Sequence, residues 1–263
     1  MGIETLKSVL HRTARSRFVD RCAGFFLACL LGFESTWAAD LPDLSVMSQD
    51  GRWVLRTENS DGALVMLDAD RNLVRRYAMT TLDRRVAPGV SALLVAPSRH
   101  SFVVVLHGVA ELWEISIDPE AGPIFDGLVH DYKMGESIGK PGFLGVRRTP
   151  LEQPFDAAFF DPANHVVLGT FHSAGQHDST NVQAINLDVR RSVASFTLRG
   201  VPRIASSTHF IWNGTKVVAV PDAVDGSVHW VDTKAWQVLK TIASSSEGAT
   251  PVAPASGAFQ RTP

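Results

Sequence analysis

The fold is indicated most directly by residues 48–79, SQDGRWVLRTENSDGALVMLDADRNLVRRYAM. Apolar, β-branched runs alternate here with turns that contain Asp50-Gly51 and Asp61-Gly62. Asp and Gly tolerate the positive φ angles that tight turns between antiparallel strands need. The segment therefore predicts a small antiparallel sheet, and helical periodicity is hard to find after residue 40.

The same unit recurs three more times, at residues 98–118, 161–198 and 212–242. The second strand of each unit ends at Asp68, Ser116, Asp188 and Asp232 in turn. Successive ends are therefore 48, 72 and 44 residues apart. Two of these spacings match the period of about 40–50 residues of a four-stranded propeller blade. Because one small sheet cannot bury both faces, the repeat predicts an all-β propeller with stacked sheets. A β-sandwich is the alternative, since it also has short strands between turns.

The repeats divide the chain into regions. Residues 40–242 hold about four to five blades, and the long spacing predicts an insertion at 122–155 whose prolines and glycines set its path without regular structure. The tail, 243–263, is rich in small residues and Pro and is predicted to be disordered. Few propellers close with four blades, so the chain is interpreted as part of a larger circle. A truncated product that does not fold stably alone is an alternative.

The N-terminal segment 1–38 has the pattern of a secretory signal peptide. A basic region at 11–21 precedes the apolar run CAGFFLACLLGF at 22–33, and small residues follow at Thr36 and Ala38. We expect cleavage after Ala38 and export to the periplasm. An uncleaved anchor is the alternative, but twelve apolar residues are fewer than the roughly 20 that cross a bilayer. Cleavage would remove both cysteines, and with them any disulfide, thiolate metal site or C-x-x-C-H haem attachment.

Composition narrows the function further. Hydrophobic residues make up 45% of the chain and charged residues 20%, which is typical of a globular core. A net charge of -2 argues against a nucleic-acid partner, which needs clustered Lys and Arg. No G-x-S-x-G, phosphate-binding glycine loop or H-E-x-x-H motif occurs. Classical hydrolase and nucleotide chemistry therefore have no support in the sequence.

The insertion contains the most informative polar residues. FDGLVHDYKMGE, residues 125–136, places His130 and Tyr132 in a polar stretch, and Arg147 and Arg148 follow. An imidazole can bind iron or transfer protons, and arginines can bind carboxylates bidentately. Together these residues could bind a polycarboxylate cofactor. The alternative is a solvated surface loop.

Other candidates carry weaker signals. Two histidines near strand ends, His107 and His209, would lie at a propeller face. A metal pair at His172 and His177 has no third ligand with diagnostic spacing, so a solvated loop is favoured. Three further histidines are expected to face outward; these are His100, His165 and His229. The odd spacing of Glu111 and Glu114 puts them on opposite faces of a strand, which argues against a carboxylate dyad.

Three stretches resemble one known family. They are ELWEISIDPEAGPIFDGLVHDYKMGE at 111–136, RRTPLEQPFDAAFFDP at 147–162 and INLDVRRSVASFTLRGVP at 185–202. These resemble the haem d1 β-propeller family, which includes the haem d1 domain of dissimilatory nitrite reductase and periplasmic proteins of haem d1 assembly. The resemblance covers about residues 42–242. It implies part of an eight-bladed ring that holds haem d1, with histidines near the iron and arginines on the carboxylates.

The resemblance also assigns roles to residues. It implies His130 and Tyr132 as catalytic residues, with His130 also the iron ligand, and a cofactor-binding set of His107, Arg147, Arg148 and Arg203. Two departures stand against it. Arg203 stands in VPRIASS where a histidine is expected, and a guanidinium is a poor metal ligand that would bind a carboxylate instead. About half of the expected blades are present.

The sequence therefore predicts an exported protein that binds haem d1 or its precursor, related to nitrite reductase or acting in haem d1 assembly during denitrification. Any oxidoreductase activity would need a partner, because the chain has no C-x-x-C-H motif of its own. The expected partners are the tetrapyrrole, a periplasmic c-type cytochrome and a second copy in a homodimer, without a membrane span in the mature protein. The alternative is a non-catalytic scaffold or binding module.

Overall fold

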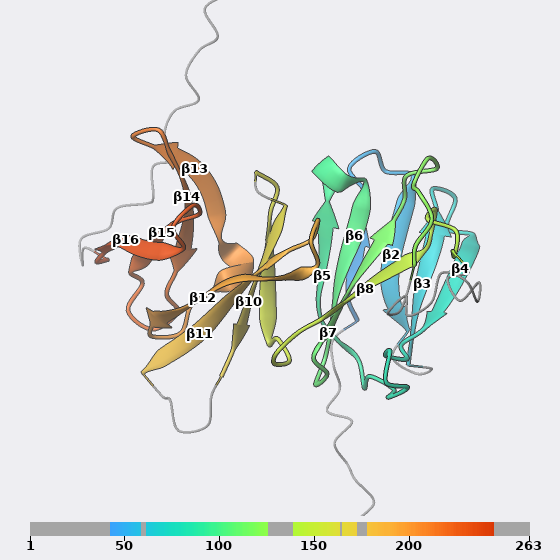
Figure 1. Ribbon diagram of the computed structural model, residues 1–263, viewed down its shortest axis with the longest axis horizontal. Coiled ribbons are helices and arrows are strands. Elements are labelled where there is room, and N and C mark those ends of the chain that lie inside the picture. The colour runs from blue at the N-terminus through green and yellow to red at the C-terminus, as the bar shows by residue number, and fades with distance from the viewer. Residues whose placement is uncertain (1–42, 59–61, 126–138, 164, 173–177, 245–263) are drawn as a thin grey trace, which may run out of the picture. The chain divides into compact units, whose positions relative to one another are not determined.

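The computed structural model describes residues 43–58, 62–125, 139–163, 165–172 and 178–244 (Figure 1). The described residues form four antiparallel sheets, and the strands of each sheet lie side by side in chain order. The first two sheets contain β1 (Ser45–Met47), β2 (Trp53–Glu58), β3 (Ala63–Asp68) and β4 (Leu73–Ala78), then β5 (Val90–Ala96), β6 (Ser101–Leu106), β7 (Glu111–Ser116) and β8 (Val146–Pro150).

The third and fourth sheets repeat this arrangement. They contain β9 (Ala157–Asp161), β10 (Val166–Phe171), β11 (Ser179–Asn186) and β12 (Arg191–Arg199), then β13 (Thr208–Trp212), β14 (Thr215–Pro221), β15 (Val228–Asp232) and β16 (Gln237–Ile242). The first strands of successive sheets, β1, β5 and β9, lie next to one another, as the inner strands of propeller blades do. Four stacked sheets confirm the predicted all-β propeller blades and exclude a two-sheet sandwich.

The core lies between neighbouring sheets. Leu64 and Met66 of β3 pack against Phe102 and Val104 of β6. The alternate residues of β6 point to the other face, so Val103 packs against the third sheet. Every residue of β6 is consequently buried, which explains why this strand is a continuous apolar run in the sequence. A further cluster joins the third and fourth sheets in the same way.

Part of the insertion is regular. The prediction that 122–155 lacks regular structure is wrong for β8, which pairs antiparallel with β7. The pairing places Arg147 opposite Glu114, and opposite charges on paired strands stabilise a sheet. The predicted signal peptide lies outside the described residues, as does the predicted tail after Ser244. In the described part of the chain, no helix is long and apolar enough to span a membrane.

Tyr77 makes the stability of this core sensitive to alkaline pH. The ring is buried between the first two sheets, its hydroxyl donates to the Leu144 carbonyl at 3.0 Å, and burial raises the pKa of Tyr77 to about 12. The folded protein therefore holds this proton more tightly than the unfolded chain, whose tyrosine pKa is about 10. We expect stability to fall between about pH 10 and 12, by up to about 1.4 kcal/mol per pH unit.

Urea unfolding across this pH range measures the effect. Tyr77→Phe removes the titrating hydroxyl, so the variant should lose less stability than the parent between pH 10 and 12, although it starts from a lower value because the hydrogen bond is gone. An identical alkaline slope in both proteins would show that another group is responsible.

Candidate functional site

The connections of the second sheet lie at two opposite ends. We call the end that carries the β7–β8 connection, residues 117–145, the insertion end; it also carries the β5–β6 turn at 97–100. The opposite end carries the β6–β7 turn, residues 107–110. Because each sheet is antiparallel in chain order, hairpin turns alternate between these ends.

The predicted site residues are distributed over both ends. His130 and Tyr132 lie outside the described residues, but the chain that flanks them is held at the insertion end by two backbone hydrogen bonds of 2.9 Å between Ile124 and Lys140. His107 lies in the turn at the opposite end, where its Nδ1 is 3.2 Å from the Ser91 hydroxyl. The flanking backbone of His130 and the turn of His107 thus belong to different ends of one sheet.

Arg203 lies in the connection between the third and fourth sheets. It is exposed and precedes a short 3-10 turn, η3 (Ile204–Ser206), while its backbone N–H donates to the Pro221 carbonyl at 2.7 Å. This connection follows β12, so it lies at the end of the third sheet away from the β11–β12 turn. The exposed guanidinium is available to a carboxylate.

Arg147 and Arg148 point to opposite faces of β8. Arg147 Nη1 is 3.5 Å from Glu114 Oε2, whereas Arg148 Nε is 3.7 Å from Glu111 Oε1. Adjacent residues of an extended strand alternate between faces, so the two guanidiniums do not converge on one carboxylate. The same contacts confirm that Glu111 and Glu114 lie on opposite faces and form no dyad. Each arginine lines a separate pocket.

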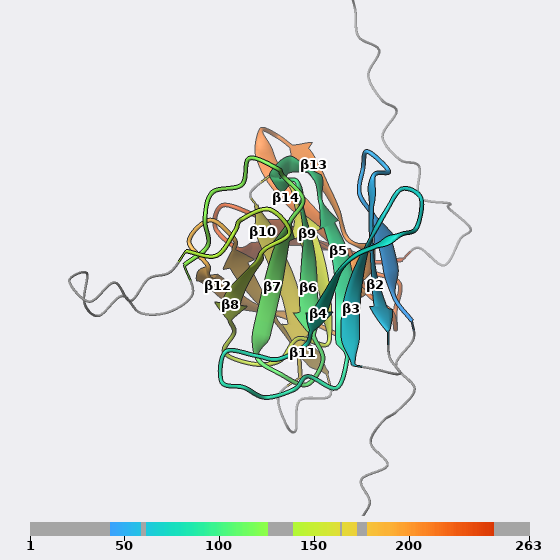
Figure 2. The same cartoon turned by 90° about the vertical axis from the view of Figure 1, so that its right-hand side faces the viewer.

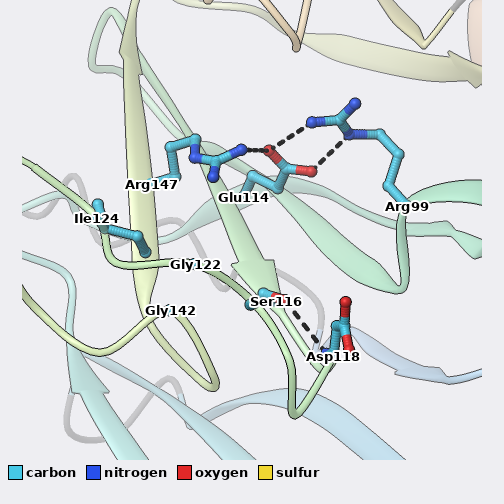
Figure 3. Close-up of a pocket in the computed structure, with 9 residues that line it drawn as sticks. Arg99, Glu114, Ser116, Asp118, Gly122, Ile124, Gly142 and Arg147 are labelled. Carbon is cyan, nitrogen blue, oxygen red and sulfur yellow. Dashed lines mark hydrogen bonds and ion pairs between the residues drawn. The ribbon is translucent and has the colours of Figure 1, made fainter.

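The first pocket, of about 180 Å³, lies at the insertion end beside Arg147 (Figure 3). Arg99 and Arg147 approach Glu114 from two sides in this view. Arg99 Nε is 2.6 Å from Glu114 Oε1, which also accepts a 3.0 Å hydrogen bond from the Ser101 hydroxyl. The Arg99 and Glu114 side chains are only 11% and 7% exposed, so this is a buried ion pair. Ser116, Asp118 and the flanks of the insertion complete the wall.

The ion pair extends to the third sheet. Arg99 also pairs with Asp188 in the β11–β12 turn, and His165 Nδ1 is 3.3 Å from the same carboxylate. Burial alone would raise the pKa of Asp188, but the hydrogen bond and charge of Arg99 outweigh it and hold the pKa below its usual value. Burial likewise opposes the charge on Arg99, but its two carboxylate partners keep its pKa raised. Arg99 and Asp188 are therefore both charged at neutral pH.

Arg147 is the side chain of this pocket that is best placed to meet a ligand. It is 38% exposed, and Glu114 is its one ion-pair partner among the described residues. A guanidinium has five N–H donors in a fixed plane, so most of its capacity for binding a carboxylate remains. No group of three metal-ligating side chains occurs in the part of the chain that the structure describes.

Among the remaining histidines, the structure corrects the predicted orientation of one. His229 was predicted to face outward, but it is buried, with Nδ1 3.0 Å from the Thr241 hydroxyl and Nε2 3.1 Å from the Arg199 carbonyl. These partners, Thr241 of the fourth sheet and Arg199 of the third, let a polar ring be buried. His172 is exposed and pairs with Asp156 at 2.8 Å, while its proposed metal partner, His177, lies outside the described residues.

Sequence reasoning did not identify Arg99 and Asp188 as members of a site. They are 89 residues apart and come from turns of two different sheets. Neither has a local motif around it. The one available signal was a charged residue at the end of an apolar strand, which is common at turns.

Comparisons with known proteins agree with this fold. Residues 42–122 match the family model described as Cytochrome D1 heme domain. The chain is 33% identical over 203 residues to a protein named dihydro-heme d1 dehydrogenase from Pseudomonas aeruginosa, which covers 77% of this chain and 36% of that protein. A solved structure, dihydro-heme d1 dehydrogenase NirN in complex with DHE, aligns with a TM-score of 0.60 and 30% identity, over 77% of this chain and 38% of that one.

The chain thus spans a little over a third of the length of these relatives. The sequence identity, the family match and the stacked four-stranded sheets point to the same group of proteins. By sequence and by fold, this chain is similar to proteins of the haem d1 β-propeller family.

Proposed function

We propose that this chain binds haem d1 or its precursor and takes part in haem d1 formation. The observation that carries the proposal is the 33% identity, over 203 residues, with a dihydro-heme d1 dehydrogenase. The similar solved structure, which is described as a complex with DHE, supports it. The chain spans only part of these relatives. Any activity of the complete relatives, such as dehydrogenation of the precursor, is therefore also part of the proposal.

The described residues fit the carboxylate edge of a tetrapyrrole, and not its whole ring. Arg147 faces a pocket at the insertion end and offers planar donors that suit a carboxylate, whereas the exposed Arg203 lies at the opposite end of the sheets and does not share this pocket. The first pocket, about 180 Å³, is smaller than the roughly 300–1,000 Å³ of small-molecule sites. A macrocycle would therefore extend beyond it.

The remaining assignments belong to the same proposal. His130 would be the axial ligand and Tyr132 would transfer protons, with His107 and Arg148 as further cofactor contacts. Export by the segment 1–38 would place the protein in the periplasm. If the precursor is oxidised, the electrons need an acceptor, and a c-type cytochrome suits a chain without a C-x-x-C-H motif.

A homodimer would supply additional blades. The fourth sheet turns one face to the third sheet, while Phe210, Trp212 and Trp230 lie on its other face. Trp230 makes edge-on contacts with Phe210 and Trp212 at ring-centroid distances of 4.9 and 5.6 Å, and Trp212 is 39% exposed. The equivalent faces of the other sheets are covered by their neighbours, so this aromatic face suits a further blade from a second copy.

Absorption spectroscopy tests the main proposal. The main absorption band of haem d1 or dihydro-haem d1 should shift when the full chain is added. Light scattering of the same sample tests the homodimer and should give the mass of two chains. Arg147→Gln should weaken binding about tenfold, which corresponds to one lost ion pair of about 1.4 kcal/mol. Arg191→Gln, at an exposed position of β12, is the matched control. A cooperatively folded sample without a spectral shift would refute the proposal.

A second candidate is a binding module without catalysis, which Arg203 favours because it replaces the histidine expected near the iron. The same spectra separate the two candidates. A binding module shifts the absorption of the precursor without converting it in the presence of an electron acceptor. His130→Ala should alter the spectrum in either case if this residue binds the iron.

A further inference from the structure

A second pocket lies on the other face of the second sheet, between its outer strands and the outer strand of the first sheet. Arg75 and Tyr77 of β4 line one side, and Trp113 of β7 with Arg148 of β8 line the other. Figure 2 looks onto the first sheet, with β4 in front of the second sheet. The volume is about 340 Å³, within the roughly 300–1,000 Å³ of small-molecule sites. We call it the rim groove.

The charges that line the rim groove have one sign. Four of its described residues are cations, Arg75, Arg76, Lys140 and Arg148, and none is Asp or Glu. Arg76 pairs with Glu58 at 2.6 Å and is thus partly neutralised. Cations brought together in a concave site attract anions, because the field lines concentrate there.

Two guanidiniums are held in place by aromatic rings. The Arg75 guanidinium lies 5.4 Å from the centre of the Tyr77 ring, and that of Arg148 lies 5.3 Å from the centre of the Trp113 ring. Both distances are within the range of cation–π attraction. This contact orients a guanidinium and leaves its N–H groups in the plane available to an acceptor.

Arg148 also has an unused buried donor. Its Nε is buried and has no hydrogen-bond partner, since the nearest carboxylate oxygen, Glu111 Oε1, is 3.7 Å away. Glu111 is already engaged, because Oε1 accepts from Trp113 Nε1 at 2.7 Å and Oε2 accepts from the Leu82 N–H at 3.0 Å. A buried donor without an acceptor is unfavourable, and it shows that Glu111 offsets the charge of Arg148 only weakly, while the 21% of this side chain that is exposed lines the groove.

We propose that the rim groove binds a small di- or tricarboxylate. One carboxylate of the ligand accepts hydrogen bonds from Arg148 and another from Arg75, so the ligand joins the first two sheets. Planar carboxylates match the fork of a guanidinium, and more than one is needed because the two arginines come from opposite sides of the groove. Arg148 is also assigned above as a tetrapyrrole contact, but Arg75 is not, and the Arg147 pocket lies on the other face of β8.

Isothermal titration of the full chain with citrate tests this site, with sodium chloride at matched ionic strength and acetate as comparison ligands. We expect saturable binding of one citrate per chain and a higher Tm, because a ligand that binds only the folded state stabilises it. Acetate, with one carboxylate, should bind at least tenfold more weakly. Arg148→Gln and Arg75→Gln should each weaken citrate binding at least tenfold.

Arg147→Gln is the matched control, because it removes the same charge from the adjacent residue on the opposite face of β8. It should leave citrate affinity within twofold of the parent. Equal losses in Arg147→Gln and Arg148→Gln would reduce the effect to overall charge and overturn the site, as would the absence of binding heat in a folded sample. If Arg148→Gln does not fold, Arg75→Gln decides the question, since Arg75 is exposed.

Discussion

Glu114→Ala is expected to lower the free energy of unfolding by about 3–5 kcal/mol, the usual cost of removing one member of a buried ion pair. Arg99 is 11% exposed and would keep its charge next to an uncharged methyl group. The Ser101 hydroxyl would lose its acceptor in the same change. Because Arg99 also pairs with Asp188, the contact between the second and third sheets should loosen. Urea unfolding monitored by tryptophan fluorescence measures the loss.

Glu58→Ala provides the matched control. Glu58 pairs with Arg76 at 2.6 Å, but both side chains are partly exposed, so the expected loss is at most about 1 kcal/mol. Replacing both partners of the buried pair, as in Arg99→Met with Glu114→Leu, should recover much of the stability, because the charges that then lose a partner, on Arg147 and Asp188, are partly exposed and not buried. Similar losses in Glu114→Ala and Glu58→Ala would mean that the Arg99–Glu114 pair is solvated in the protein.

Gly169→Ala adds a single methyl group but should cost about 3 kcal/mol or more, at the upper end of overpacking costs. A Cβ at residue 169 would lie 1.9 Å from Cδ2 of Phe155 and 2.1 Å from its Cε2. Phe155 cannot move away easily, because it is fully buried in the cluster between the second and third sheets and stacks on Phe171. Thermal unfolding followed by circular dichroism measures the effect.

A double-mutant cycle identifies the cause. Phe155→Ala alone removes a buried ring and should itself cost about 3–5 kcal/mol. In the double variant the new methyl group occupies part of the space that the ring leaves, so the combined loss should be smaller than the sum of the single losses. Gly122→Ala is the control, since its Cβ would meet no atom within 4 Å. Additive losses would show that Gly169 is needed for a reason other than contact with Phe155.

The repeat in the sequence was sufficient to predict stacked antiparallel blades, because side chains that alternate between two faces leave a period of two in each strand. The β6 segment shows where this local pattern is less clear. Its unbroken apolar run predicts only burial, and the structure shows that the burial comes from sheets on both sides. The buried His229 and the strand β8 within the insertion were missed, because both depend on partners from neighbouring strands.

The candidate site was predictable only in part. Arg147 and Arg148 stood out as a charged pair, and the alternation rule that separated Glu111 from Glu114 applies to them as well once β8 is known to be a strand. Arg99 could not be found, since its contact with Asp188 joins turns 89 residues apart. The order of polar and apolar residues along the chain determined the blades, which were predicted as about four to five, and the described residues form four sheets. The stacking of the sheets decided which charges meet, because ionic contacts between blades depend on distances in space that leave no periodic trace in the sequence.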